Sequence, residues 1–214
     1  LKKQLAQALS DSFSAVYQQL TEALYRHGYR LEGTDIAKRQ LRNVLLSYLA
    51  EVNSDNNWFE SVYQQADNMT DSLGVLQAVS WSQHACSAAL LERFDGQWRG
   101  EKLVMDKWFQ TQALADDEAT VERVKALMQH PDFSLDNPNR VYSLLAAFTQ
   151  NLAQFHRADG AGYRLIADVI TALNSSNPQV ASRLLNAFMS WRRYDASRQA
   201  LMKQQLEHFQ ALPN

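Results

Sequence analysis

Apolar residues recur every three or four positions along almost the whole chain of 214 residues. This is the spacing at which side chains fall on one face of an α-helix. The first run stops at Gly28, and its members are Phe13, Val16, Tyr17, Leu20 and Leu24. No segment has the sustained alternation of apolar and polar residues that a half-buried strand requires. The pattern therefore predicts an all-α protein.

The same spacing predicts further helices in the first half of the chain. The second helix is expected to take Asp35 as its cap, and its expected buried stripe is Ile36, Leu41, Leu45, Leu46 and Leu49. Shorter helices are expected around residues 58–63, from Thr70 to about residue 79, and over residues 85–94, where Asp95-Gly96 ends the pattern. Another is expected around residues 103–109.

The second half of the chain repeats itself with a period of about forty residues. Asn137-Pro138 and Asn177-Pro178 each place a capping Asn before a Pro at the first helical position. The residues Leu144, Leu145 and Phe148 return 40 positions later as Leu184, Leu185 and Phe188. In the preceding helices, Val121, Val124, Leu127 and Met128 match Tyr163, Ile166, Val169 and Ile170 at an offset of 42.

A helix pair that repeats at this period is typical of a HEAT- or armadillo-like superhelix of stacked helix pairs, an α-solenoid. One helix of each pair would then line a concave surface. The alternative is that two amphipathic helices resemble each other by chance. We expect residues 1–214 to form a single α-helical superhelical domain.

Composition agrees with this fold class and excludes others. Gly 7 and Pro 4 are too few for the turns of a sandwich, barrel or propeller. The single cysteine, Cys86, excludes a disulfide framework and a cysteine-based zinc site, so we expect a small core residue in a reducing compartment. A hydrophobic fraction of 46% excludes a disordered chain.

The net charge and the two ends of the sequence limit the classes of partner that we expect for this chain. Lys+Arg 21 against Asp+Glu 23 gives a net charge of −2, which argues against nucleic-acid binding. No apolar run approaches the roughly 18 residues of a membrane helix. The chain starts Leu1-Lys2-Lys3-Gln4-Leu5, without an initiator Met or the apolar stretch of a signal peptide. We therefore expect it to belong to a longer polypeptide.

A search for chemistry finds no catalytic constellation. None of the five histidines lies three or four residues from another, and no His-Glu-x-x-His motif is present. The glycine-rich Asp159-Gly160-Ala161-Gly162 is better explained as a turn before a helix than as a phosphate site. The acidic Asp116-Asp117-Glu118 precedes a helix, where carboxylates favour the positive end of the helix dipole. That interpretation is preferred to a metal site.

Three polar groups have functional alternatives. Gln179 and Arg183 are four residues apart and share a helix face, so they could hold a carboxylate or peptide backbone or lie on an ordinary solvated face. The basic residues Lys38, Arg39 and Arg42 favour local ion pairing near Asp35 over a phosphate surface. The segment Trp191-Arg192-Arg193-Tyr194-Asp195 fits either cation–aromatic stacking or a helix corner capped by Asp195.

Several longer strings, taken in order, are more specific than periodicity. The first half contains Ala37-Lys38-Arg39-Gln40-Leu41-Arg42-Asn43, Asn68-Met69-Thr70-Asp71 and Leu103-Val104-Met105-Asp106-Lys107-Trp108-Phe109. The second half contains Asn137-Pro138-Asn139-Arg140, Asp159-Gly160-Ala161-Gly162-Tyr163, Leu173-Asn174-Ser175-Ser176-Asn177-Pro178-Gln179-Val180-Ala181-Ser182-Arg183-Leu184 and Arg193-Tyr194-Asp195. Over the whole chain this series resembles the C-terminal helical domain of bacterial aminopeptidase N, a family of zinc-dependent alanyl aminopeptidases of the gluzincin class.

The resemblance implies a part of a cytoplasmic enzyme of peptide catabolism. In that family the zinc ligands and the catalytic glutamate lie in an upstream catalytic domain, so this segment is expected to hold no catalytic residue, no metal and no cofactor, and to be inactive alone. Its expected partners are the catalytic domain of the same polypeptide and peptide substrates, with no nucleic acid and no membrane. The family's C-terminal domain walls off an internal chamber, and an apolar face of it meets the catalytic domain.

The resemblance also implies a role for the shared face of Gln179 and Arg183, which would face the chamber as candidates to contact the C-terminal side of a bound peptide. One departure concerns Tyr142, where some family members have an arginine. The alternative function, from the residues alone, is a free-standing helical-repeat scaffold that binds a peptide or protein partner in its groove.

Overall fold

The computed structural model describes residues 1–211, and over that range it contains helices and their connections but no strand. The predicted all-α class is therefore confirmed. The helices form two compact units, Leu1–Gln97 and Trp98–Asn214, and each is described by itself below. The expectation of one superhelical domain over residues 1–214 stays a prediction, and its last three residues lie outside the described part.

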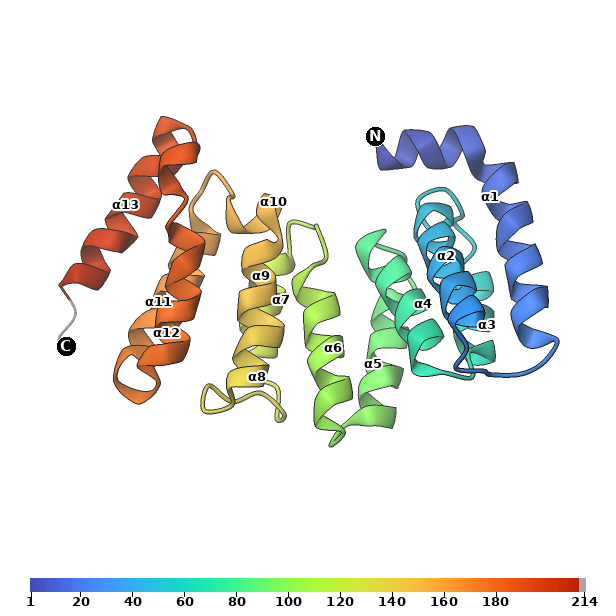
Figure 1. Cartoon of the computed structure of the whole chain (residues 1–214). Helices are drawn as coiled ribbons and strands as arrows, with labels where there is room; N and C mark the ends of the chain where they lie inside the picture. Colours follow the sequence, from blue (N-terminus) through green and yellow to red (C-terminus); the bar gives the residue numbers. More distant parts are fainter. Residues whose placement is uncertain (212–214) are drawn as a thin grey trace. The chain divides into compact units, whose positions relative to one another are not determined.

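Unit 1 is built from helices in the order of the chain (Figure 1). They are α1 (Lys2–Tyr25), α2 (Gly33–Leu49), α3 (Asn56–Gln65), α4 (Met69–Trp81) and α5 (Ser87–Trp98). Helix α2 lies between α1 and α4, and α3 packs against α4. Phe59, Leu76 and Val79 are fully buried between these helices, and Cys86 is a buried free thiol, as expected of a small core residue.

The predicted buried stripe of α2 is only half right. Leu45, Leu46 and Leu49 are buried, whereas Ile36 and Leu41 are 44% and 47% exposed. The helix also begins three residues earlier than predicted, with Glu32 at its N-cap and Asp35 inside its first turn. The side chains that take the buried positions near its start are charged, not apolar, and the two largest of them are basic.

Arg39 and Arg42 occupy those positions, with only 4% and 2% of their surface exposed. The Arg39 guanidinium donates twice to the carbonyl oxygen of Arg30, at 3.0 Å each. Arg42 forms an ion pair with Asp71 of α4, at 2.7 Å. Of the expected local ion pairs with Asp35, only that of Lys38 forms, at 3.4 Å. A buried cation needs such partners. Because the partners lie on the core side of α2, the arginines of its first half are buried and the apolar residues Ile36 and Leu41 are exposed.

Two other helix ends differ from the prediction. Helix α4 begins at Met69, one residue before the expected Thr70, and its cap is Asn68, whose side chain accepts a hydrogen bond from the backbone N–H of Asp71 at 3.0 Å. Helix α5 continues through Asp95-Gly96 to Trp98. A glycine inside a helix costs only about 1 kcal/mol, and the fully buried Phe94 anchors the helix at this point.

Unit 2 contains the remaining helices (Figure 1). Its first helices are α6 (Lys102–Ala113) and α7 (Thr120–Leu127). A continuous helical run follows, made of α8 (Pro138–Val141), a π-helical turn η1 (Tyr142–Ala146) and α9 (Ala147–Gln150). The last elements are α10 (Leu152–Phe155), α11 (Ala161–Ser176), α12 (Pro178–Leu185), the short 3₁₀ turns η2 (Asn186–Phe188) and η3 (Trp191–Arg193), and α13 (Ala196–Gln210).

The predicted repeat is present in unit 2. Asn137 and Asn177 both act as side-chain N-caps, each followed by Pro at the first helical position. Phe148 and Phe188, which are equivalent in the repeat, are both fully buried. In the second copy the capped helix α12 packs on α11, whereas in the first copy the capped run packs mainly on α6 and meets α7 through η1. The Asn-Pro pairs therefore mark the beginning of equivalent helices.

Buried polar side chains connect neighbouring helices of unit 2 through backbone carbonyl groups. The amide nitrogen of Asn151, the cap of α10, donates to the carbonyl oxygens of Ala113 and Ala115 at 3.2 and 2.8 Å, at the end of α6. The buried Arg140 donates to the carbonyl oxygens of Asp132 and Lys102 at 2.8 and 2.9 Å, and it also pairs with Asp106. The carbonyls of Ala113 and Ala115 lie at the end of α6 and have no partner within that helix, so the neighbouring element supplies the donor.

Asn151→Ala should destabilise the chain, because it leaves the buried carbonyl groups of Ala113 and Ala115 without a donor. We expect the free energy of unfolding in urea to fall by about 2–3 kcal/mol. The matched control is Gln150→Ala at the exposed neighbouring position, where we expect a change of under about 0.5 kcal/mol. Equal losses in the two variants would show that the hydrogen bonds of Asn151 do not hold α6 and α10 together.

Candidate functional site

A cavity of about 380 Å³ opens in unit 2 between the corner of α9 and α10 on one side and α12 with η2 on the other. We call it the Arg183 pocket, after its cation. Its polar lining includes hydroxyl groups, amides and an imidazole, and its apolar lining comes from the core below. The lining residues are Ala146, Thr149, Gln150, Leu152, Phe155, His156, Arg183, Leu184, Asn186, Ala187, Ser190 and Tyr194.

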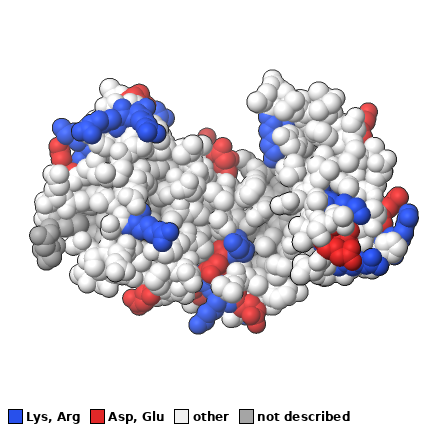
Figure 2. Space-filling model, in the orientation of Figure 1, with Lys and Arg blue, Asp and Glu red and all other residues white. Residues whose placement is uncertain are grey.

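Arg183 reaches this pocket because α12 is amphipathic, with its apolar residues on one side. Val180 and Leu184 are buried on one side of the helix, so Arg183 projects from the opposite side and is exposed. Its guanidinium lies over the ring of Tyr142, 4.8 Å from the ring centre, a cation–π contact that orients it without an ion pair. Figure 2 shows an isolated basic group over α12 within an uncharged surrounding.

Gln179 lies one turn earlier on α12 and is also exposed. The two predicted site residues therefore share the outward side of the helix, but only Arg183 lines the pocket. Tyr142, noted in the sequence as a departure from the related family, is the residue under the guanidinium. The positive charge at this place is that of Arg183.

A hydrogen-bonded group of aromatic residues forms the floor of the pocket. The Nδ1 atom of His156 lies 2.8 Å from the hydroxyl of Tyr163, and its Nε2 atom lies 2.7 Å from the hydroxyl of Tyr194. The rings of His156 and Tyr194 are stacked, with centres 4.0 Å apart. Arg198 donates to the backbone carbonyl of His156 at 2.6 Å. The contacts connect α10, α11 and α13.

Burial lowers the pKa of His156 to about 4, and the nearby positive charge of Arg198 acts in the same direction. The imidazole is therefore neutral near pH 7, with one ring nitrogen donating and the other accepting. The sequence offered no signal for this arrangement beyond an unpaired histidine, because Tyr163 and Tyr194 come from different helical elements. Its role in the pocket is to fix the positions of two tyrosine hydroxyls.

The pocket combines one oriented cation with neutral donors and acceptors. Guanidinium offers a planar set of donors that matches a carboxylate or a backbone carbonyl. Within the part of the chain that the structure covers, no group of three His, Cys, Asp or Glu side chains could hold a metal ion. The residues therefore do not fit a zinc site, and the arrangement favours binding over catalysis.

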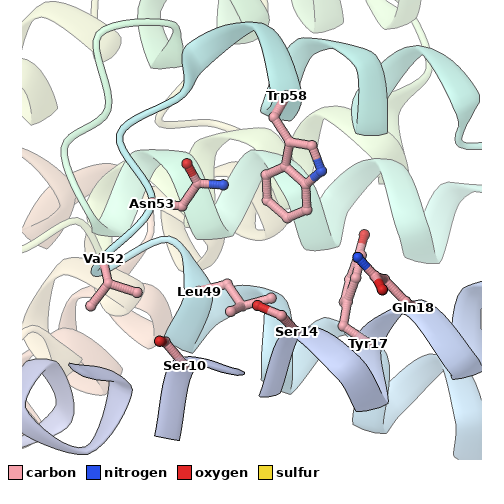
Figure 3. Close-up of a pocket in the computed structure, with 8 residues that line it drawn as sticks. All are labelled: Ser10, Ser14, Tyr17, Gln18, Leu49, Val52, Asn53 and Trp58. Carbon is pink, nitrogen blue, oxygen red and sulfur yellow. The ribbon is translucent and has the colours of Figure 1, made fainter. Parts of the chain in front are cut away.

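A second pocket, in unit 1, has a different character (Figure 3). It measures about 410 Å³ and is lined by Ser10, Ser14, Tyr17, Gln18, Leu49, Val52, Asn53 and Trp58. Figure 3 shows Trp58 facing the side chains that project from α1, and its ring meets that of Tyr17 edge-on at 5.7 Å. No lining residue carries a charge, so the pocket offers no fixed partner for an ionised ligand.

The other motifs weighed in the sequence have structural roles. Gly160 has a φ of +68° at the N-cap of α11, and a Cβ on Gly162 would lie 2.5 Å from the carbonyl oxygen of Phe155. The glycine-rich segment is thus a turn before a helix, as predicted, and Gly162 also permits a close approach of α11 to α10. The carboxylate of Asp117, within the acidic triplet, accepts from the backbone N–H of Ala119 and pairs with Arg123 at 2.7 Å.

In the segment from Trp191 to Asp195, the structure contains both the helix cap and the cation–aromatic contact that the sequence offered as alternatives. Asp195 caps α13 by accepting from the N–H of Arg198 at 3.1 Å. The Arg192 guanidinium lies over the ring of Trp191, 4.7 Å from its centre. In Figure 2 a group of basic side chains gathers over η3 and the start of α13.

No helix in the described part of the chain is long and apolar enough to span a membrane.

Comparison with known proteins identifies relatives over the whole chain. A family model described as "Domain of unknown function (DUF3458_C) ARM repeats" matches residues 1–214. The chain is 41% identical over 215 residues to aminopeptidase N of Haemophilus influenzae and 42% identical over 217 residues to aminopeptidase N of Escherichia coli; each alignment covers 100% of this chain and 24% of the relative. Aminopeptidase N of Caulobacter vibrioides is 43% identical over 150 residues, 70% of this chain and 17% of the relative.

A solved structure agrees with these relatives. The crystal structure of Legionella pneumophila aminopeptidase A in complex with aspartic acid superposes with a TM-score of 0.86 at 32% identity, over 97% of this chain and 25% of that one. The chain thus spans about a quarter of the length of the proteins it matches. The armadillo-type repeat inferred from the period of forty residues is confirmed by the family description.

The lowered pKa of His156 predicts that acid destabilises the fold. An unfolded chain, whose histidine pKa is near 6.5, takes up a proton that the folded protein, at a pKa of about 4, does not. The contribution is therefore complete above pH 6.5 and is lost as the pH falls towards 4. Between pH 7.5 and 5 the free energy of unfolding should fall by about 2 kcal/mol through this group.

Urea unfolding of His156→Gln over the same pH range measures this contribution. The substitution should remove that part of the pH dependence, because Gln does not titrate. His27→Gln, at an exposed position, is the control and should leave the pH dependence as it is. An unchanged slope in His156→Gln would contradict the assignment.

Proposed function

The chain belongs to the family of ARM-repeat domains whose model matches all its residues, and on this premise we propose that it is the helical C-terminal part of a zinc-dependent aminopeptidase. Such an enzyme removes N-terminal amino acids from peptides. The observation that carries the proposal is the identity of 41–42% with two enzymes named aminopeptidase N, over the entire chain. Because the chain spans 24% of each, the activity is assigned to the longer polypeptide.

Within that polypeptide, we assign the chain a role in enclosing the cavity in which the peptide is cut. The Arg183 pocket supports a contact with the peptide, since its one cation is exposed and oriented by Tyr142. A guanidinium suits the carboxylate at the C-terminal end of a short peptide. Gln179, exposed one turn away on α12, would offer an amide to the peptide backbone.

No step of the hydrolysis is assigned to the described residues. They bring together no metal-binding group, so the zinc ion belongs, under this proposal, to the rest of the polypeptide. The part played by this chain is to bind and orient the peptide and to limit access of solvent. The buried thiol of Cys86 is in keeping with a reducing, cytoplasmic compartment.

A second candidate function is a free-standing helical-repeat scaffold that binds a peptide or protein. The uncharged pocket of Trp58 and Tyr17 favours this alternative, because it does not depend on a catalytic domain. The reading frame upstream of Leu1 separates the two. A catalytic domain with a His-Glu-x-x-His motif there supports the enzyme, whereas an initiation codon directly before Leu1 supports the scaffold.

The 214-residue chain alone should release no p-nitroaniline from alanyl-p-nitroanilide, with or without added zinc. The physical reason is the absence of a metal-binding group among the described residues. The longer polypeptide, assayed in parallel, is the positive control. Zinc-dependent release by the 214-residue chain would overturn this division of roles.

In the longer polypeptide, Arg183→Ala should raise KM for tri- and tetrapeptides about 10-fold, the equivalent of about 1.4 kcal/mol. That is the low end for a hydrogen bond to a charged group, because the site is open to water. KM for alanyl-p-nitroanilide, which does not reach the pocket under this proposal, should stay unchanged. The measurement is steady-state kinetics with substrates of increasing length.

Arg192→Ala is the matched control, because Arg192 is an exposed arginine that also lies over an aromatic ring but does not line the pocket. It should leave KM unchanged for every substrate length. Equal effects of Arg183→Ala on peptides and on the one-residue amide would remove Arg183 from peptide binding.

A further inference from the structure

Helix α2 presents an apolar, uncharged side to solvent. We call this side the α2 outer face and define it by Ile36, Ala37, Gln40, Leu41 and Val44, all exposed. Its three large side chains, Ile36, Leu41 and Val44, are 44%, 47% and 53% exposed. They lie within about 140° around the helix axis, at 100° per residue. The face therefore forms one uncharged strip that is apolar except for Gln40.

The strip is unusual because of what lies behind it. The opposite side of α2 buries Asp35, Arg39 and Arg42, so in the first half of this helix three charged side chains lie inside while Ile36 and Leu41 lie outside. Desolvating arginines is costly, and their partners Asp71 and the carbonyl of Arg30 fix the helix in this rotation. A helix that packed only within unit 1 would gain by the reverse arrangement. The exposed strip is thus built into the fold.

We propose that the α2 outer face is a docking surface for the remainder of the longer polypeptide, which meets it with an apolar, uncharged surface. This rests on the proposed function, in which the chain is about a quarter of an aminopeptidase. The length outside this chain argues for that occupant, because the two relatives that align with the whole chain are about four times as long. The absence of charge on the strip excludes an acidic or basic partner surface.

The size of the strip argues against a second copy as the occupant. A helix of 17 residues is about 26 Å long, and one side of it buries on the order of 250 Å². A stable interface between separate proteins needs about 800 Å² per partner. A surface on the same polypeptide loses far less freedom when it docks, because the connection already holds it nearby. A small apolar face suffices only in that case.

The experiment compares Leu41→Glu in two proteins, the 214-residue chain and the longer polypeptide, by thermal unfolding. In the 214-residue chain Leu41 is exposed, so Tm should change by less than about 1 °C. In the longer polypeptide the carboxylate would be buried against an apolar surface, and Tm of the transition that contains this segment should fall by at least about 4 °C. Val44→Glu should behave in the same way.

Leu103→Glu is the matched control, since Leu103 is 76% exposed on α6 of unit 2 and lies outside the face. It should lower Tm of the longer polypeptide by clearly less than Leu41→Glu. Equal falls for Leu41→Glu and Leu103→Glu, or no fall for Leu41→Glu in the longer polypeptide, would overturn the proposal.

Size-exclusion chromatography with light scattering tests the competing occupant. A dimer of the 214-residue chain that Leu41→Glu dissociates would assign the face to a second copy and overturn the proposal, whereas a monomer supports it. None of these measurements uses peptide hydrolysis. If the longer polypeptide had no aminopeptidase activity, the proposed function would be contradicted. The Tm measurements would still test the docking surface independently.

Discussion

Short stacked helices end often, and each end leaves backbone carbonyl groups that have no partner within the helix. When such an end is buried, a donor must come from elsewhere, or the fold loses stability. In this protein the donor is repeatedly a polar side chain of a neighbouring element. Asn151 binds carbonyls at the end of α6, and Arg198 binds that of His156 at the end of α10. Arg140 and Arg39 bind carbonyls elsewhere, those of Asp132, Lys102 and Arg30. Apolar packing between helices tolerates sliding, whereas these directional bonds fix which turn of one helix lies beside which turn of the next.

The candidate site follows from this constraint. Arg198 and the two tyrosines hold His156 at the base of the Arg183 pocket, and the buried Val180 and Leu184 set the rotation of α12. Arg183 is then left to stack on Tyr142 with its remaining donors open to solvent. In unit 1 the carbonyl of Arg30 and the carboxylate of Asp71 hold Arg39 and Arg42 on the buried side of α2, so that Ile36, Leu41 and Val44 face solvent. Both exposed features, the cation and the apolar strip, therefore depend on buried polar bonds.

The sequence predicts those parts of the fold that rest on local chemistry. The helical class follows from the apolar spacing, and the repeat of unit 2 follows from Asn137-Pro138 and Asn177-Pro178, because capping acts within a few residues. Which side of α2 is buried could not be predicted, because the ion-pair partner of Arg42 is Asp71 on another helix. The apolar spacing predicted that Ile36 and Leu41 are buried. In the structure they are exposed, because the ion pair of Arg42 with Asp71 stabilises the opposite rotation of the helix by more than burial of these two side chains would. His156 was missed for the same reason, since its partners belong to α11 and to the connection before α13.

The central claim is that the Arg183 side of this segment meets the C-terminal end of a peptide bound in a longer aminopeptidase. A tetrapeptide with a photoreactive group on its last residue, irradiated with the longer polypeptide and mapped by mass spectrometry, tests it most directly. The account predicts that the label falls on residues of the Arg183 pocket, within residues 146–194, and that an excess of unlabelled tetrapeptide suppresses it. Labelling confined to residues outside this chain, or unaffected by competing peptide, would contradict the claim.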